Sequence, residues 1–129
     1  MVTKLKSVHS SYKMTELGKI PMEWEIGVLG DKKYSLKITQ GPNPKYNLGE
    51  IDSKYRVIKT KNLYDREIYY KSTDHISKET LEDCRSSILK DEDILIAIVG
   101  KGSIGKSNIF KAQNDIQYIF TRALGLVRL

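Results

Sequence analysis

Cysteine, histidine and long apolar runs are scarce in this sequence, and each scarcity excludes a class of protein. The chain has 129 residues and one cysteine, Cys84, so it cannot form an internal disulfide or a cysteine-based zinc site. His9 and His75 are its two histidines, and neither has a second metal ligand or a nucleophile nearby in the sequence. No apolar run approaches the ~18 residues that a membrane span needs, and the N-terminus lacks the apolar core of a signal peptide. We therefore expect a cytoplasmic protein with no metal, cofactor or membrane anchor.

Positive charge is abundant but unevenly distributed along the chain. The net charge is +6, from 22 Lys and Arg against 16 Asp and Glu. Residues 1–60 carry +5, residues 61–94 carry −3, and residues 95–129 carry +4. An acidic middle between two basic parts favours one positive face, which is typical of a protein that binds a polyanion such as nucleic acid.

A glycine-rich basic loop, residues 100–107, follows the apolar run Ile94 to Val99. The run predicts a buried strand, and the loop matches the phosphate-binding pattern G-x-x-x-x-G-K-[ST]. That pattern works in nucleotide binding only when a helix follows the lysine, because the phosphate lies at the N-terminus of that helix. The segment after Ser107 shows no helical apolar stripe, and the 22 residues that remain are too few for a nucleotide-binding domain. Nucleotide binding at Gly100–Ser107 is therefore a minor alternative, and a phosphate of a nucleic-acid backbone is the ligand we favour.

The remaining patterns predict many short strands and one clear helix. Segments with alternating or continuous apolar residues predict strands. Ser77 followed by Glu79 predicts the start of a helix. The buried face of that helix is predicted to carry Leu81, Cys84 and Ile88. Thr15–Gly18 predicts a short turn, Trp24 a core anchor, and Leu124, Leu126 and Leu129 core positions. The predicted strands are 25–29, 34–39, 55–60, 94–99, 107–110, 116–120 and 123–129, with a turn near 65–66. This is a β-rich α+β fold: a curved mixed or antiparallel sheet with one or two short helices.

Two polar segments have the composition of recognition loops. Gln40 to Tyr46 holds a glycine and two prolines, so it is stiff and loses little entropy on binding. Lys59 to Asn62 places two cations and an amide at the end of a predicted strand. Lysines suit phosphates, and an asparagine can pair with adenine.

Five stretches together give the chain a resemblance to a known family. They are Leu17–Pro21 with Trp24 and Leu29–Asp31, Thr39–Pro44, Tyr55–Leu63, His75–Ser77, and Ile88–Lys106. In this order and spacing the sequence resembles a target recognition domain of a type I restriction-modification specificity subunit. Where the family carries an Asn-Gln pair near its last strands, this chain has Thr121-Arg122.

The resemblance implies a DNA-reading module that is not itself an enzyme. It implies sequence-specific recognition of one half of a bipartite site in double-stranded DNA. Methylation and cleavage come from partner modification (methyltransferase) and restriction subunits. We expect a tail over residues 1–14 and a single recognition domain over 15–129, without the family's spacer helix and second domain. A second recognition domain or a homodimer is a further possible partner.

Eleven residues are candidates for DNA contact because they combine cations, amides and aromatic groups at predicted strand ends and in stiff loops. They are Gln40, Asn43, Lys45, Tyr46, Lys59, Lys61, Asn62, Lys101, Ser103, Lys106 and Arg122. An alternative is that a truncated recognition domain acts as a protein-interaction module on a methyltransferase complex.

Overall fold

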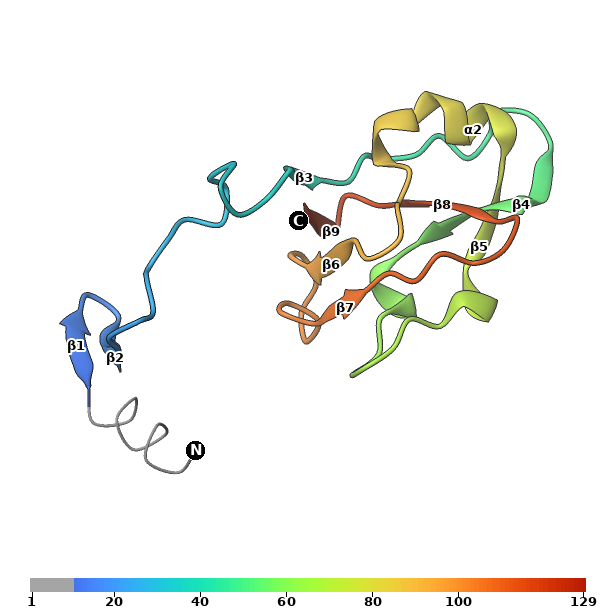
Figure 1. Ribbon diagram of the computed structural model, residues 1–129. Coiled ribbons are helices and arrows are strands. Elements are labelled where there is room, and N and C mark those ends of the chain that lie inside the picture. Colours follow the sequence, from blue (N-terminus) through green and yellow to red (C-terminus); the bar gives the residue numbers. More distant parts are fainter. Residues whose placement is uncertain (1–10) are drawn as a thin grey trace. The chain divides into compact units, whose positions relative to one another are not determined.

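The computed structural model describes residues 11–129, which form two compact units, 11–31 and 32–129 (Figure 1). The predicted tail over 1–14 lies mostly outside the described residues, as does His9. Its last part, from Tyr12, belongs to a strand. The prediction of a single recognition domain over 15–129 stays a prediction.

The first unit contains a short antiparallel hairpin. Strand β1 (Tyr12–Thr15) pairs with β2 (Gly18–Pro21), and the predicted turn between them is confirmed. Gly18 has φ 108°, a left-handed conformation that glycine adopts without strain, and Thr15 Oγ1 donates to its carbonyl at 2.7 Å. Within this unit Trp24 is 60% exposed, so the prediction of a core anchor is wrong.

The second unit contains a four-stranded antiparallel sheet. Its strand order is β3-β9-β6-β7, and each neighbouring pair is antiparallel. The strands are β3 (Lys37–Gln40), β6 (Ile94–Ala97), β7 (Ser107–Ile109) and β9 (Leu124–Arg128). Asp93, which is 1% exposed, accepts two hydrogen bonds of 2.8 Å from Arg128, so the start of β6 is tied to the end of β9.

A three-stranded mixed sheet completes the second unit, in the order β5-β4-β8. Strand β4 (Ile51–Ile58) pairs antiparallel with β5 (Asp74–Ser77) and parallel with β8 (Gln117–Phe120). The single α-helix of the described residues, α2 (Lys78–Asp83), begins where predicted, because Ser77 Oγ accepts a hydrogen bond from the Thr80 amide. Short 3₁₀ helices span Thr60–Asn62, Tyr70–Ser72 and Arg85–Ser87.

The three-stranded sheet is buried on both faces. Neighbouring residues of a strand point to opposite faces, and here Val57 and Ile58 of β4 belong to different apolar clusters. Val57 packs with Leu81 and Cys84 of the α2 segment, whereas Ile58 packs with Leu95 of the four-stranded sheet. The second unit is therefore layered as helix, mixed sheet and antiparallel sheet.

The α+β fold class is confirmed, whereas several local predictions are wrong. Residues 25–29 form no strand, β4 spans Ile51–Ile58 where a strand over 55–60 was predicted, and Leu129 is 66% exposed rather than in the core. Cys84 is buried as predicted. Across the described part of the chain, no helix has the length and apolar character needed to cross a bilayer.

Candidate nucleic-acid interface

Four strand ends meet at one edge of the second unit. Strands β4 and β8 run parallel, and their last residues, Ile58 and Phe120, lie opposite each other. The segments that follow the two strands therefore start at the same edge of the sheet. Gln40 at the end of β3 lies opposite Gly125, and Ala97 at the end of β6 lies opposite Leu124. Each of these partners is at the start of β9, directly after the turn that leaves β8. The register therefore brings the segments after β3, β4, β6 and β8 together.

An open groove of about 860 Å³ lies between these segments. Its walls come from the proline-containing segment, the end of β4, the β6–β7 loop and the β8–β9 turn. Six of the sequence-predicted residues line it, in company with five that were not predicted. The predicted ones are Gln40, Asn43, Tyr46, Lys59, Lys61 and Arg122, and the others are Pro44, Thr60, Val99, Thr121 and Ala123.

The proline-containing segment is fixed against the β8–β9 turn by Gly41. A Cβ atom at this position would lie 2.1 Å from the Thr121 carbonyl oxygen, so only glycine allows the two backbones to approach this closely. The Gly41 amide donates to the Leu124 carbonyl at 3.0 Å, and Gln40 Nε2 donates to the Arg122 carbonyl at 2.8 Å. These contacts give one wall of the groove a defined position.

Helix α2 holds the other end of the same segment. Thr80 Oγ1 donates to the Lys45 carbonyl at 2.6 Å, and Ser77 Oγ donates to the Leu48 carbonyl. The Lys45 side chain is exposed, but Lys45 does not line the groove. The loop is therefore anchored through its backbone, which leaves this lysine available to solvent.

Lys59 and Lys61 share one carboxylate, that of Asp74. Lys59 Nζ lies 2.9 Å from Asp74 Oδ2, and Lys61 Nζ lies 3.2 Å from Oδ1. Lys59 Nζ also lies 4.9 Å from the centre of the Tyr46 ring, a cation–π contact. The hydrogen bond between Lys59 and Asp74 is the main cause that raises the pKa of Lys59 and lowers the pKa of Asp74. The two lysines place two cations at the groove, and the single carboxylate of Asp74 partly offsets them.

Arg122 contributes an exposed cation from the β8–β9 turn. Within residues 11–129 its guanidinium takes part in no recorded ion pair, whereas Arg128 is paired with Asp93. A guanidinium of this kind is the commonest group for reading guanine in the major groove.

Asn62 was predicted to read a base, but its position is structural. The side chain is fully buried; Oδ1 accepts from the Lys59 amide at 2.8 Å, and Nδ2 donates to Ser72 Oγ at 3.2 Å. With both polar atoms engaged inside the fold, the amide cannot face a base edge. Its role in this structure is to hold the turn that carries Lys59 and Lys61.

The glycine-rich loop is a hairpin between β6 and β7 and not a P-loop. The strand β7 follows Lys106, where a phosphate-binding loop needs a helix. Amides that could cradle a phosphate are used within the loop: Ser103 and Ile104 donate to the Gly100 carbonyl, and Gly105 donates to Ala97 at 2.9 Å. Gly100, Gly102 and Gly105 have φ of 114°, 81° and 95°, so the turns of the hairpin account for the glycines.

The predicted loop residues Lys101, Ser103 and Lys106 do not line the groove, although Val99 of the same loop does. Lys106 is exposed, and its carbonyl accepts a hydrogen bond from the amide of Ala97, the last residue of β6. Lys106 therefore lies at the edge of the sheet where the groove lies.

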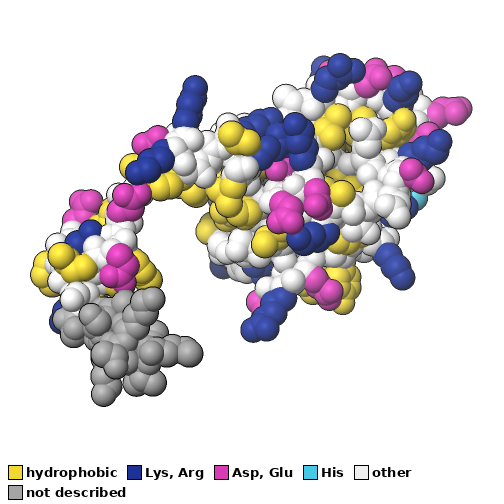
Figure 2. Space-filling model, viewed as in Figure 1, with side chains coloured by type: hydrophobic (Ala, Val, Ile, Leu, Met, Phe, Trp, Pro, Cys, Tyr) yellow, Lys and Arg dark blue, Asp and Glu magenta, His cyan; other side chains and the backbone are white. Residues whose placement is uncertain are grey.

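On the face drawn in Figure 2, basic side chains lie at separate points, mixed with acidic ones. The prediction of one positive face stays a prediction.

Sequence reasoning missed Asp74 and Thr60, for different reasons. Thr60 lies between two predicted lysines, so its position at a strand end was an available signal. Asp74 reaches the lysines only because β5 pairs with β4, with Val57 opposite Asp74. That pairing is a long-range contact that no local pattern reveals.

Among residues 11–129, no three His, Cys, Asp or Glu side chains are grouped as a metal site would need.

A search of protein-family models found none that matches this chain. The chain is similar to a protein of Methanocaldococcus jannaschii whose name is "Putative type I restriction enzyme MjaX specificity subunit". The two are 31% identical over 114 residues, which cover 84% of this chain. The chain spans about a quarter of that relative's length, 24%. The similarity therefore concerns one part of a longer protein.

Proposed function

We propose that this chain is a target recognition domain of a type I restriction-modification specificity subunit, and that its groove reads one half of a bipartite site in duplex DNA. The observation that carries the proposal is the convergence of Gln40, Lys59, Lys61 and Arg122 on one groove from segments far apart in the sequence. The similarity to a named specificity subunit over most of the chain supports the same assignment.

The groove offers two kinds of group that DNA recognition needs. Lys59 and Lys61 are lining cations suited to backbone phosphates, and Lys59 Nζ lies 4.9 Å from the centre of the Tyr46 ring. Lys45, Lys101 and Lys106 are exposed cations on adjoining loops and extend the phosphate contacts. These contacts position the duplex without carrying sequence information.

Base reading is assigned to the polar side chains of the groove and the adjoining hairpin. Arg122 is suited to guanine, and Asn43 to adenine. Gln40 gives its amide N–H to the Arg122 carbonyl, so it presents its carbonyl oxygen as an acceptor. Ser103 is the candidate from the β6–β7 loop. Asn62 is omitted because it is buried.

In this proposal the chain has no catalytic function of its own. Partner methyltransferase and restriction subunits supply methylation and cleavage, and a second recognition domain reads the other half of the site. One module of this size offers roughly 600–1,000 Å² to DNA, so binding by the isolated chain is expected to be weak. Linking two modules raises the affinity through effective concentration.

The test is selection of duplexes from a pool of random sequence by the 129-residue chain, followed by binding titrations. The proposal expects enrichment of a short motif, and Arg122→Ala should lose roughly 1–3 kcal/mol of discrimination at one base pair. Arg85→Ala is the matched control, because Arg85 is exposed and does not line the groove. Absence of any duplex binding, together with capture of methyltransferase subunits, would instead favour a protein-interaction module.

A further inference from the structure

Val99 is an apolar side chain that lines the groove without belonging to either core cluster. It follows the end of β6 and is 52% exposed, so it contributes little to the stability of the fold. A single exposed apolar side chain is ordinary on a protein surface. What distinguishes Val99 is its place in the groove, among the polar and basic groups to which DNA binding is assigned.

The backbone of Val99 is bonded to the turn that carries Arg122. The Val99 amide donates to the Ala123 carbonyl at 3.3 Å, and the turn is closed by the bond from the Leu124 amide to the Thr121 carbonyl, 3.0 Å long. Because valine branches at Cβ, its side chain has few rotamers to lose when it contacts a ligand. The fold therefore presents a stiff apolar group next to a base-reading arginine.

Methyl groups continue from Val99 along the same part of the groove. Thr121 and Ala123 flank Arg122 in the sequence, both are half-buried, and both line the groove. Alanine, the methyl group of threonine and other apolar side chains make apolar contacts with bases. The surroundings of Arg122 are thus apolar enough to receive an apolar group of a ligand.

The charges around Val99 indicate the class of ligand that this apolar group meets. Among the described residues that line the groove, Lys59, Lys61 and Arg122 are basic and none is Asp or Glu. The nearby carboxylate of Asp74 offsets part of the charge of the two lysines. The groove is therefore suited to a polyanion, and Val99 lies within it.

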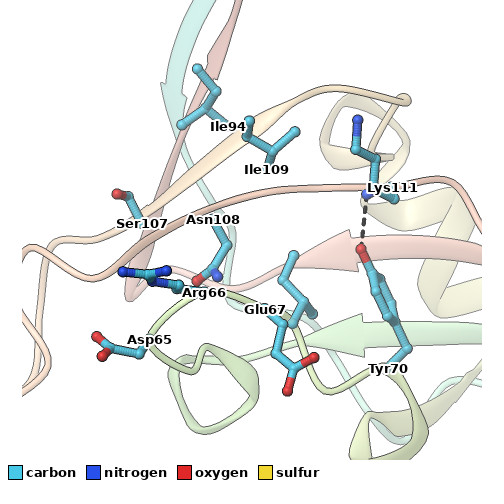
Figure 3. A pocket seen from close by; sticks show the side chains of 10 residues that line it. Asp65, Arg66, Glu67, Tyr70, Ile94, Ser107, Asn108, Ile109 and Lys111 are labelled. Carbon is cyan, nitrogen blue, oxygen red and sulfur yellow. Dashed lines mark hydrogen bonds between the residues drawn. The ribbon is translucent and has the colours of Figure 1, made fainter.

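A second cleft, of about 710 Å³, places an equally exposed apolar side chain among different charges (Figure 3). Ile109 lines this cleft and is also 52% exposed, but Asp65 and Glu67 line the cleft with it. These carboxylates repel a phosphate backbone, and the basic residues Arg66 and Lys111 of the same cleft only balance them. Ile109 is therefore the matched control for Val99.

We propose that Val99 is a specificity-determining residue that contacts the C5 methyl group of a thymine. This assignment rests on the proposed function, and it names a base in the half of the site that the groove reads. In the major groove the base edges present donors, acceptors and one apolar group, which is the thymine methyl. An exposed apolar side chain in a base-reading groove therefore has one counterpart among the bases.

The fold also indicates where this thymine lies in the DNA. Val99 is joined through Ala123 to the turn of Arg122, and successive bases of a strand are only about 3.4 Å apart. The thymine should therefore occupy a base pair next to the guanine that Arg122 reads.

Uracil tests this contact, because it keeps every hydrogen-bonding group of thymine and lacks only the methyl group. Each thymine of the duplex selected by the 129-residue chain is replaced in turn by uracil, and the dissociation constant is measured by fluorescence anisotropy. Burial of one methyl group changes an equilibrium constant roughly fourfold. The affinity should fall about fourfold at one position, next to the guanine whose recognition Arg122→Ala abolishes, and stay unchanged at the other thymines.

Variants of the protein show whether Val99 is the side chain that meets this methyl group. Val99→Ala should bind the thymine duplex about fourfold more weakly and should no longer distinguish uracil from thymine, because the two losses concern one contact. Ile109→Ala should keep the full effect of uracil. Neither substitution changes a charge, so the salt dependence of binding should stay the same in both variants.

The outcomes separate this inference from the proposed function. Sequence-specific binding in which no thymine position responds to uracil would overturn the role of Val99, and so would a uracil effect that Val99→Ala leaves intact. The proposed function would survive either result if Arg122→Ala still relaxed the preference at its own base pair. A chain that selects no duplex motif would overturn the proposed function and the thymine contact together.

Discussion

The sequence predicted DNA-contacting lysines both at the groove and in the β6–β7 hairpin, but the two regions are built differently. In the groove, side chains from four segments converge, and Lys59 is held by both Asp74 and Tyr46. In the hairpin, the glycines serve turns and the amides of Ser103, Ile104 and Gly105 are bonded within the loop. Convergence of side chains, rather than a local motif, is what distinguishes the better candidate for a binding site.

The largest effect should come from the glycine that joins the walls of the groove. Gly41→Ala places a Cβ atom 2.1 Å from the Thr121 carbonyl oxygen and 2.8 Å from Phe120 Cδ2. Backbone cannot move aside cheaply, so we expect a loss of roughly 3 kcal/mol in the free energy of unfolding. Urea denaturation followed by circular dichroism measures this loss.

The matched control is Gly102→Ala in the hairpin. A Cβ atom there meets no other atom within 4 Å, and the only cost is the φ of 81°. The expected loss is about 1–2 kcal/mol. If Gly102→Ala were the more destabilising of the two, the close approach at Gly41 would not be the feature that fixes the groove.

Asn62→Ala should reduce stability and leave sequence preference unchanged. The substitution leaves the partly buried Lys59 amide without its acceptor and Ser72 Oγ without the donor Asn62 Nδ2. A loss of about 2 kcal/mol in the free energy of unfolding is expected. Urea denaturation and duplex selection should be run on the same preparation. Full stability with a changed base preference would restore Asn62 to the DNA interface.

The two pairs of lysines should differ in their effect on the salt dependence of binding. Each phosphate neutralised contributes about 0.9 to the log–log slope, so Lys101→Ala with Lys106→Ala should flatten it by about 1.8. Lys59→Ala with Lys61→Ala should flatten it by only about 0.9, because Asp74 already offsets part of their charge. Fluorescence anisotropy at several salt concentrations measures both slopes. A slope that either pair leaves unchanged would exclude that pair from the interface.

The smallest effect is expected at Asp74. Asp74→Asn removes the carboxylate that competes with phosphate for Lys59 and Lys61, and the slope should steepen by up to about 0.9. Non-specific affinity should rise a few fold at low salt. Glu92→Gln is the matched control, because Glu92 forms a comparable exposed pair with Lys111 at 3.3 Å and does not line the groove. Equal affinities of the two variants would show that Asp74 does not limit phosphate binding.

Local signals in the sequence were sufficient where the structure depends on neighbours in the chain. Ser77 and Glu79 predicted the start of α2, and Leu81 lies on its buried face as predicted. The helix ends at Asp83, so Cys84 and Ile88, predicted on the same face, lie beyond it, although both pack in the same apolar cluster as Leu81. The turn at Thr15–Gly18 was predictable for the same reason. Caps, turns and short amphipathic helices depend on contacts within a few residues, so composition and spacing record them.

Long-range contacts account for most of the errors. The alternation of residues 25–29 resembles a strand, but a strand also needs a partner to pair with, and none is present among the described residues. The parallel pairing of β4 with β8 joins residues some sixty positions apart, and it is this pairing that places Lys59 beside the Thr121 turn. The burial of Asn62 likewise follows from a hydrogen bond to Ser72, outside its own segment. About half of the residues that line the groove could therefore be predicted from the sequence, whereas their arrangement in space could not.

We propose that duplex DNA lies in the groove where the four strand ends meet. Titration of the ¹⁵N-labelled chain with a short duplex, followed by amide NMR, tests it directly. If DNA binds there, Lys59, Lys61 and Arg122 should show saturable amide shifts that weaken with salt, and α2 should show none. Shifts that spare these three residues while the chain binds the duplex would contradict it.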